Sequence, residues 1–151
     1  MPFSLIRFNL IDPTLDSQSL SDRYKAMLDM AEFADQNGFF MATFEEHHGA
    51  DNAWSPTPLM NAGTVLARTT TLSASISALL LPLHDPIRVA EDIAVIDLMS
   101  GGRLTVIFGL GYRPSEYQLM GKDWDNRGKI MDESIQTLLD AWTGEPFQYK
   151  G

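Results

Sequence analysis

Cysteine is absent from the 151-residue sequence, which excludes disulfide bonds, thiolate metal sites and a cysteine nucleophile. Basic residues are scarce: 11 Lys and Arg stand against 20 Asp and Glu, for a formal net charge of −9. A general nucleic-acid binder needs an excess of basic residues, and an anionic membrane surface would repel this chain. The longest uninterrupted apolar run, residues 78–83, is far short of the roughly 20 residues of a membrane-spanning helix. We therefore expect no nucleic-acid and no membrane partner.

The N-terminal residues also lack a basic stretch followed by a long apolar run, so we expect no targeting segment and a cytoplasmic location. Of all residues, 44% are hydrophobic, 21% are charged and 10% are aromatic. This composition is typical of a folded globular domain and excludes a disordered tail or a low-complexity segment. The length suits one domain, and we expect residues 1–151 to form a single domain.

Strand and helix patterns alternate along the chain. Short apolar runs that end at turn residues predict strands, and apolar residues at three- and four-residue spacing predict helices. Pro58 and Pro86 each follow a residue that can cap a helix, which is typical of a helix start. Ser19 is the expected cap of the first helix. The expected strands are 4–10, 39–44, 71–81 and 104–108, and the expected helices are 20–37, 58–68, 86–99 and 126–142, with a further one near 114–116.

This order of elements predicts an α/β fold in which helices cover a parallel sheet. Two architectures satisfy it: a doubly wound open sheet, or part of a (β/α)₈ TIM barrel. A full barrel needs roughly 250 residues, so this chain would supply about half a barrel, as four parallel βα units. A half-barrel would present an apolar inner face and unpaired strand edges, and we expect it to self-associate as a homo-oligomer.

A cluster of polar residues follows the second predicted strand: Glu45, Glu46, His47 and His48. In both architectures the carboxyl ends of parallel strands line the active site. Histidine moves protons near neutral pH, and a neighbouring carboxylate can fix its tautomer. We interpret His47 and Glu46 as candidate catalytic residues, with a solvated charged loop as the alternative. We expect no metal site, because adjacent histidines seldom converge on one ion and His84 is the only further histidine.

Small residues mark the ends of the third and fourth predicted strands. Gly109 and Gly111 would let a ligand or another backbone approach closely. The full dinucleotide fingerprint needs a third glycine where Pro114 stands, so a Rossmann site has little support. Residues 73–78 are small at alternate positions, which leaves room either for a flat ligand or for large side chains of the neighbouring strand.

Three segments carry a resemblance to a known family: Glu46-His47-His48, residues 81–103, and Gly109-Leu110-Gly111 followed by Glu116, Gly121 and Arg127. In order and spacing they resemble the bacterial luciferase-like flavin-dependent monooxygenases. The resemblance covers nearly the whole chain, and segment 81–103 is its most specific part. It implies a (β/α)₈ barrel of which residues 1–151 are the N-terminal half, so we expect a truncated form of a longer enzyme.

The resemblance implies an oxidoreductase that uses reduced flavin and O₂ to oxygenate a small organic substrate such as an aldehyde. His47 matches the family's catalytic histidine, and Glu46 matches the carboxylate that supports the site. Ser77 and Ala78 match the strand-end pair that lies against the flavin ring, often through a non-proline cis peptide bond. Gly109 matches a small residue near the reactive side of the ring.

Leu110 departs from the family pattern, because the luciferase alpha subunit has a phosphate-binding arginine there. By its position we still place Leu110 in the cofactor-binding set. We expect reduced FMN rather than the deazaflavin F420, since the triplet from Glu46 to His48 is closer to the FMN-using members. The alternatives are an F420-dependent oxidoreductase and a non-catalytic, flavin-binding or structural half-barrel. Helices within residues 58–99 offer a further surface for pairing, as is common in luciferase-like enzymes.

Overall fold

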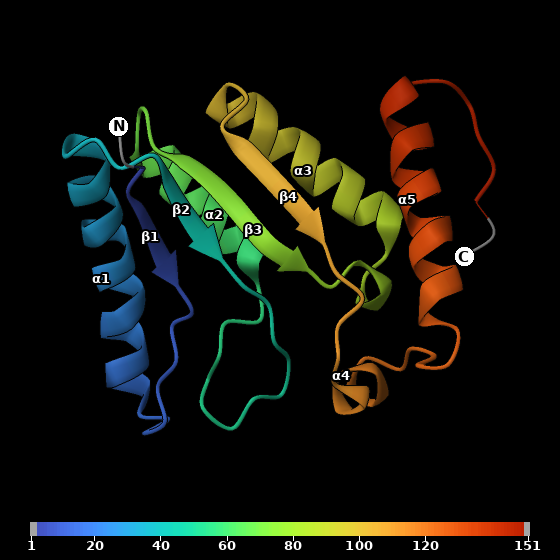
Figure 1. Cartoon of the computed structure of the whole chain (residues 1–151), viewed down its shortest axis with the longest axis horizontal. Helices are drawn as coiled ribbons and strands as arrows, with labels where there is room; N and C mark the ends of the chain where they lie inside the picture. Colours follow the sequence, from blue (N-terminus) through green and yellow to red (C-terminus); the bar gives the residue numbers. More distant parts are fainter. Residues whose placement is uncertain (1–2, 150–151) are drawn as a thin grey trace.

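The computed structural model describes residues 3–149, and its strands and helices alternate as the sequence predicts (Figure 1). The strands are β1 (Leu5–Phe8), β2 (Met41–Phe44), β3 (Ser73–Leu79) and β4 (Leu104–Phe108). The α-helices are α1 (Ser17–Gln36), α2 (Pro58–Arg68), α3 (Pro86–Ser100), α4 (Pro114–Leu119) and α5 (Arg127–Thr143), and the 3₁₀ helix η1 covers Leu81–Leu83. The first two and last two residues of the expected domain lie outside the described part.

The four strands form one parallel sheet in the order β1-β2-β3-β4. Two rows of apolar side chains run across the sheet and pack into the main core with the helices: Ile6, Ala42, Ala74 and Leu104, then Phe8, Phe44, Ile76 and Val106. The helix residues of this core include Met27, Val65 and Val89. A doubly wound sheet reverses its strand order and carries helices on both faces. The described sheet follows chain order and packs its core on one face, which is the arrangement of a (β/α)₈ TIM barrel.

The face of the sheet that points away from the helices is mostly polar. One row across this face consists of Arg7, Thr43, Ser75 and Thr105. Leu5 and Ile107 are its exposed apolar residues on the outer strands. The expected apolar inner face is therefore wrong, because strand alternation sends most of the large apolar side chains to the helix-covered side.

Some elements begin at residues other than those predicted. Asp16, and not Ser19, caps α1: its carboxylate accepts the backbone N–H of Ser19 at 2.8 Å. The expected strand 71–81 is shorter because the carboxylate of Asp35 accepts the backbone N–H groups of Thr71 and Leu72 before β3 begins. Among the described helices, none is long and apolar enough to cross a membrane.

Arg103 connects the start of β4 to the segment between α2 and β3. Its guanidinium donates to the carbonyl oxygens of Leu66 and Leu72, each at 2.8 Å, and to the carbonyl of Thr69 at 3.1 Å. It also donates to the carbonyl of Ser100 at 2.9 Å. One side chain thus satisfies carbonyl groups where two helices end, which explains an arginine directly after two glycines.

We expect Arg103→Met to lower the free energy of unfolding by about 3 kcal/mol. The substitution keeps an unbranched side chain but leaves several carbonyls without a charged donor, and each unsatisfied buried group costs roughly 1–3 kcal/mol. Arg68→Met is the matched control, because Arg68 forms only exposed ion pairs with Asp29 and Glu32 worth at most about 1 kcal/mol. Urea unfolding measures both variants. Equal losses would contradict the role given to Arg103.

Candidate active site

The carboxyl ends of the strands open onto a cleft of about 480 Å³. In Figure 1 the loop after β2, the turn at η1 and helix α4 all lie near this edge of the sheet. The cleft is within the size range of small-molecule sites. All six residues proposed from the sequence line it: Glu46, His47, Ser77, Ala78, Gly109 and Leu110. The remaining lining includes Arg7, Trp54 and Tyr112.

The ends of β3 and β4 form a close-packed floor of this cleft. The peptide bond between Ser77 and Ala78 is cis, as the resemblance implied. A Cβ atom at Gly109 would lie 2.8 Å from the Cβ of Ala78, so a side chain there would force the two strand ends apart. The carbonyl of Leu110 accepts a hydrogen bond of 2.5 Å from the hydroxyl of Tyr117, which holds the segment after β4. The floor therefore consists of backbone and small side chains.

His47 is held by Glu116, which comes from α4. The His47 Nδ1 atom lies 2.8 Å from Glu116 Oε1, and the same oxygen accepts the backbone N–H of His48 at 3.0 Å. Because a backbone N–H can only donate, Oε1 is an acceptor, and the proton of the neutral imidazole belongs on Nδ1. His47 Nε2 is then the unprotonated nitrogen, 3.4 Å from the hydroxyl oxygen of Tyr112.

The carboxylate that fixes the tautomer of His47 is therefore Glu116, and the expectation that its neighbour in the sequence would do so is wrong. Glu46 and His47 both line the cleft, but their side chains bind different segments of the chain. Glu116 is 1% exposed, and its second oxygen, Oε2, has no hydrogen-bond partner among residues 3–149. Both hydrogen bonds that the Glu116 side chain forms within residues 3–149 thus go to the segment that carries His47.

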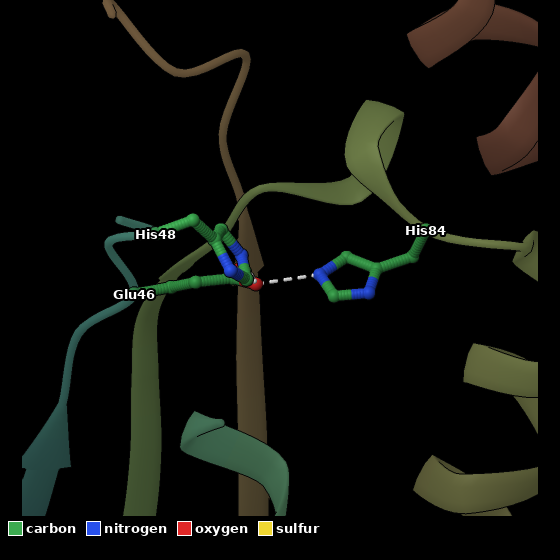
Figure 2. Close-up of side chains that lie close together, drawn as sticks. All are labelled: Glu46, His48 and His84. Carbon is green, nitrogen blue, oxygen red and sulfur yellow. Dashed lines mark hydrogen bonds and ion pairs between the residues drawn. The ribbon is translucent and has the colours of Figure 1, made fainter. Parts of the chain in front are cut away.

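Glu46 instead links the loop after β2 to the segment after β3. Figure 2 shows its side chain meeting those of His48 and His84. Its Oε1 atom accepts from His48 Nε2 at 2.8 Å and from His84 Nε2 at 2.6 Å, and its Oε2 atom accepts the backbone N–H of Leu80 at 2.5 Å. Burial raises the pKa of Glu46, but the hydrogen bonds from His48, His84 and Leu80 lower the pKa to about 2. The hydrogen bond to Glu46 in turn raises the pKa of His48.

Aromatic rings pack against His47 from two sides. The ring of Trp54 lies 4.5 Å from the imidazole and the ring of Tyr112 lies 5.6 Å away, both edge-on. The guanidinium of Arg113 lies 5.8 Å from the Trp54 ring and 5.4 Å from the Tyr112 ring, close enough for cation–π attraction. These contacts restrict the imidazole plane and give the cleft an aromatic wall.

The sequence reasoning missed the roles of Trp54, His84, Tyr112 and Glu116. Tyr112 and Glu116 follow the fourth predicted strand, so the strand-end argument that selected His47 would also find them. The same argument also reaches His84, which follows the third predicted strand by three residues. Trp54 lies in the middle of a loop, and no local pattern identifies it.

The sequence profile of the family described as luciferase-like monooxygenase matches residues 1–151, so the chain belongs to this family. It is 27% identical over 153 residues to the oxygenase component of flavin-dependent trigonelline monooxygenase from Acinetobacter baylyi, covering 100% of this chain and 42% of that protein. Among solved structures it is similar to monooxygenase RslO1 from Streptomyces bottropensis, with a TM-score of 0.87 and 27% identity. This match covers 100% of the present chain and 46% of RslO1.

A second solved structure, the oxygenating constituent of 3,6-diketocamphane monooxygenase from Pseudomonas putida in complex with FMN, has a TM-score of 0.88 and 20% identity. The match covers 100% of this chain and 42% of that one. The likeness places the described sheet in the TIM-barrel fold of these enzymes. The chain spans less than half the length of each of these proteins.

We expect His48→Gln to remove part of the pH dependence of stability. Because Glu46 raises the folded-state pKa of His48, this pair stabilises the fold fully below the unfolded pKa of about 6.5, and the contribution is lost as the pH rises through the higher folded pKa. Urea unfolding over a pH series should therefore show the advantage of the wild type over His48→Gln declining above about pH 6.5. A difference that does not change with pH would contradict this linkage.

Proposed function

We propose that the protein containing this chain is a flavin-dependent monooxygenase in which His47 is the catalytic residue. The observation that carries the proposal is the orientation of His47, whose Nδ1 is bound to Glu116 and whose Nε2 is left as a proton acceptor at the cleft. Family membership supports the same class of reaction. We also propose that residues 1–151 form one domain, which supplies four of the eight βα units of a barrel.

Reduced FMN is the cofactor that we propose, and the FMN in the diketocamphane monooxygenase structure supports it. The residues present fit the ring portion of a flavin: Ser77, Ala78 and Gly109 form a floor without large side chains, against which a flat ring can lie. They fit the phosphate less well, since Leu110 is apolar and Arg7 already forms an ion pair with Glu45. We therefore assign the ring site to this chain.

When bound, the reduced flavin supplies the electrons that activate O₂ for transfer of one oxygen atom to the substrate. His47 holds or accepts a proton at Nε2. Glu116 keeps the imidazole in the required tautomer and orientation. Trp54 and Tyr112 restrict the imidazole and help to exclude water from it.

The substrate class that we propose, besides O₂, is a small organic molecule such as an aldehyde. The wall of the cleft supports it, because Trp54, Leu80, Leu110 and Tyr112 present apolar or aromatic surface. Such a surface binds an uncharged organic group better than a highly charged one. The excess of acidic residues supports the proposal that nucleic acids are not partners.

We expect His47→Asn to lower turnover by about 10²–10⁴-fold, because Asn can still donate toward Glu116 but has no Nε2 to take a proton. Binding of FMN should change little, since the floor of the cleft is intact. Oxygen uptake and product formation with reduced FMN and an aldehyde series measure turnover, and a flavin titration measures binding. Unchanged turnover would remove His47 from the mechanism.

The same assays separate the competing proposals. Binding and oxidation of reduced F420, without binding of FMN, would identify an F420-dependent oxidoreductase. Binding of FMN without oxygen uptake for any substrate would favour a flavin-binding protein. Binding of neither cofactor by the full protein would leave only the structural half-barrel.

We further propose that copies of the chain associate through α2 and α3. Large apolar side chains on these helices are exposed, among them Met60, Val95, Leu98 and Met99. Leu98 is 82% exposed, which is unusual for a leucine on a helix that also contributes to the core. A second copy that covered this patch would remove it from water.

Sedimentation equilibrium at micromolar concentration should therefore detect a dimer or a larger assembly. Leu98→Glu should shift this equilibrium toward the monomer, because burying an unpaired carboxylate opposes association. Met30→Glu is the matched control, since Met30 is exposed on α1 and lies outside the proposed interface. A compact wild-type monomer of 16.8 kDa would contradict the proposal.

A further inference from the structure

His84 lies between η1 and α3, and its side chain reaches Glu46 across 38 positions of the sequence. The imidazole points at the end of the Glu46 side chain, together with that of His48 (Figure 2). The mechanism proposed above uses neither of these two imidazoles. Because Glu46 is an ionised carboxylate that can only accept, each of the two Nε2 atoms must carry a proton directed at Oε1.

The second oxygen of Glu46 fixes the backbone of the cleft. Oε2 accepts the N–H of Leu80, the residue that follows β3, and Leu80 lines the cleft. One residue earlier, the carbonyl of Leu79 accepts the N–H of Gly109 at 2.8 Å, which attaches the end of β4. Glu46 therefore connects the segment that carries His47 to both strand ends that form the floor.

The orientation of this carboxylate depends on its Oε1 donors. Two imidazole N–H groups on Oε1 limit rotation of the carboxylate about the Cγ–Cδ bond, which keeps Oε2 directed at the Leu80 amide. His48 is exposed to 11% and shares its loop with His47, whereas His84 enters from a different element. Of the two imidazoles, His84 is thus the one that holds the Glu46 carboxylate from outside the loop after β2.

We propose that His84 is a positioning residue for His47. By donating from Nε2 to Glu46 Oε1, it holds the Glu46 carboxylate on the Leu80 amide and so sets the separation between the His47 imidazole and the floor of the cleft. This inference rests on the proposed function only for its effect on turnover. Its structural part, the link from His84 through Glu46 to Leu80, is independent of any cofactor.

The same three side chains have ligand-type atoms within 4.8 Å of one another, which raises the question of a metal ion. Two imidazoles and one carboxylate are a common ligand set for transition metals. Here, however, both Nε2 atoms are within 2.8 Å of a single carboxylate oxygen, which is hydrogen-bond geometry. A metal ion could bind only after both Nε2 protons had been lost.

Two substitutions of His84 test the inference. His84→Gln keeps an N–H donor at a similar reach from the backbone, whereas His84→Phe keeps a ring and removes the donor. Arg88→Gln is the control, because Arg88 is exposed on α3 and, within residues 3–149, forms its ion pairs with Glu91 and Asp92. The first readout is cofactor-free: hydrogen exchange of the Leu80 amide and the NMR chemical shifts of the His47 imidazole, both in the full protein.

We expect the Leu80 amide to lose protection and the NMR signals of the His47 imidazole to move in His84→Phe, with both restored in His84→Gln and unchanged in Arg88→Gln. In the oxygenation assay, kcat should fall by about 10- to 100-fold in His84→Phe and recover to within a few fold in His84→Gln, since small displacements of reacting groups cost factors of this size. The KM for the substrate should stay nearly constant.

Unchanged Leu80 exchange and unchanged His47 chemical shifts in His84→Phe would overturn the inference. The inference would also be overturned if kcat fell equally in both His84 variants and thermal stability fell by a matching amount. That result would indicate a role of His84 in folding alone. Stoichiometric Zn²⁺ binding by the wild type that is lost in His84→Gln would overturn it in favour of a metal site. If the wild type shows no oxygenation, the proposed function fails, and the NMR and exchange data still decide the inference.

Discussion

The carboxylate of Glu46 is buried where β2 ends, and its charge must be compensated inside the protein. Removing an ionised carboxylate from water costs several kcal/mol unless hydrogen-bond donors replace the water. Here His48, His84 and the amide of Leu80 are those donors, and each belongs to a segment that borders the cleft. Satisfying one buried charge therefore brings together the loop after β2, the end of β3 and the start of α3.

A second buried carboxylate, that of Glu116 on α4, binds the same loop. Glu116 accepts from the His47 imidazole and from the His48 backbone, so α4 holds the loop in place from beyond the end of β4. The loop that carries His47 is thus bound both to the segment after β3, through Glu46, and to α4, through Glu116. A proton-transfer group needs a defined position relative to its partner, and this arrangement supplies it before any ligand binds.

The sheet itself explains why the cleft opens where it does. Its large apolar side chains point to the helices, and small polar residues such as Ser75, Ser77 and Thr105 point to the other face. In a TIM barrel that other face is the interior, which is filled by layers of side chains. Small residues at the carboxyl end of β3 leave space there, and the aromatic rings of Trp54 and Tyr112 border it.

The sequence by itself determined the order of the elements and some of their ends, because these depend on neighbours in the chain. Helix α2 and strand β4 have the predicted bounds, Pro58–Arg68 and Leu104–Phe108, since proline, apolar runs and glycines are local signals. The strand-end rule likewise pointed to Glu46 and His47, the resemblance to the family added Ser77, Ala78, Gly109 and Leu110, and all six line the same cleft. The start of β3 escaped prediction because Asp35, on α1, competes for the backbone N–H groups before it.

Only the tertiary structure decided which carboxylate serves which histidine. His47 pairs with Glu116, 69 positions away, and Glu46 pairs with His84, 38 positions away, although Glu46 and His47 are adjacent in the chain. The two adjacent side chains bind segments from different parts of the chain, so proximity in the sequence was misleading. A hydrogen bond tolerates only a few tenths of an ångström of variation in the donor–acceptor distance. The fold sets that distance between segments far apart in the chain, and no local pattern in the sequence encodes it.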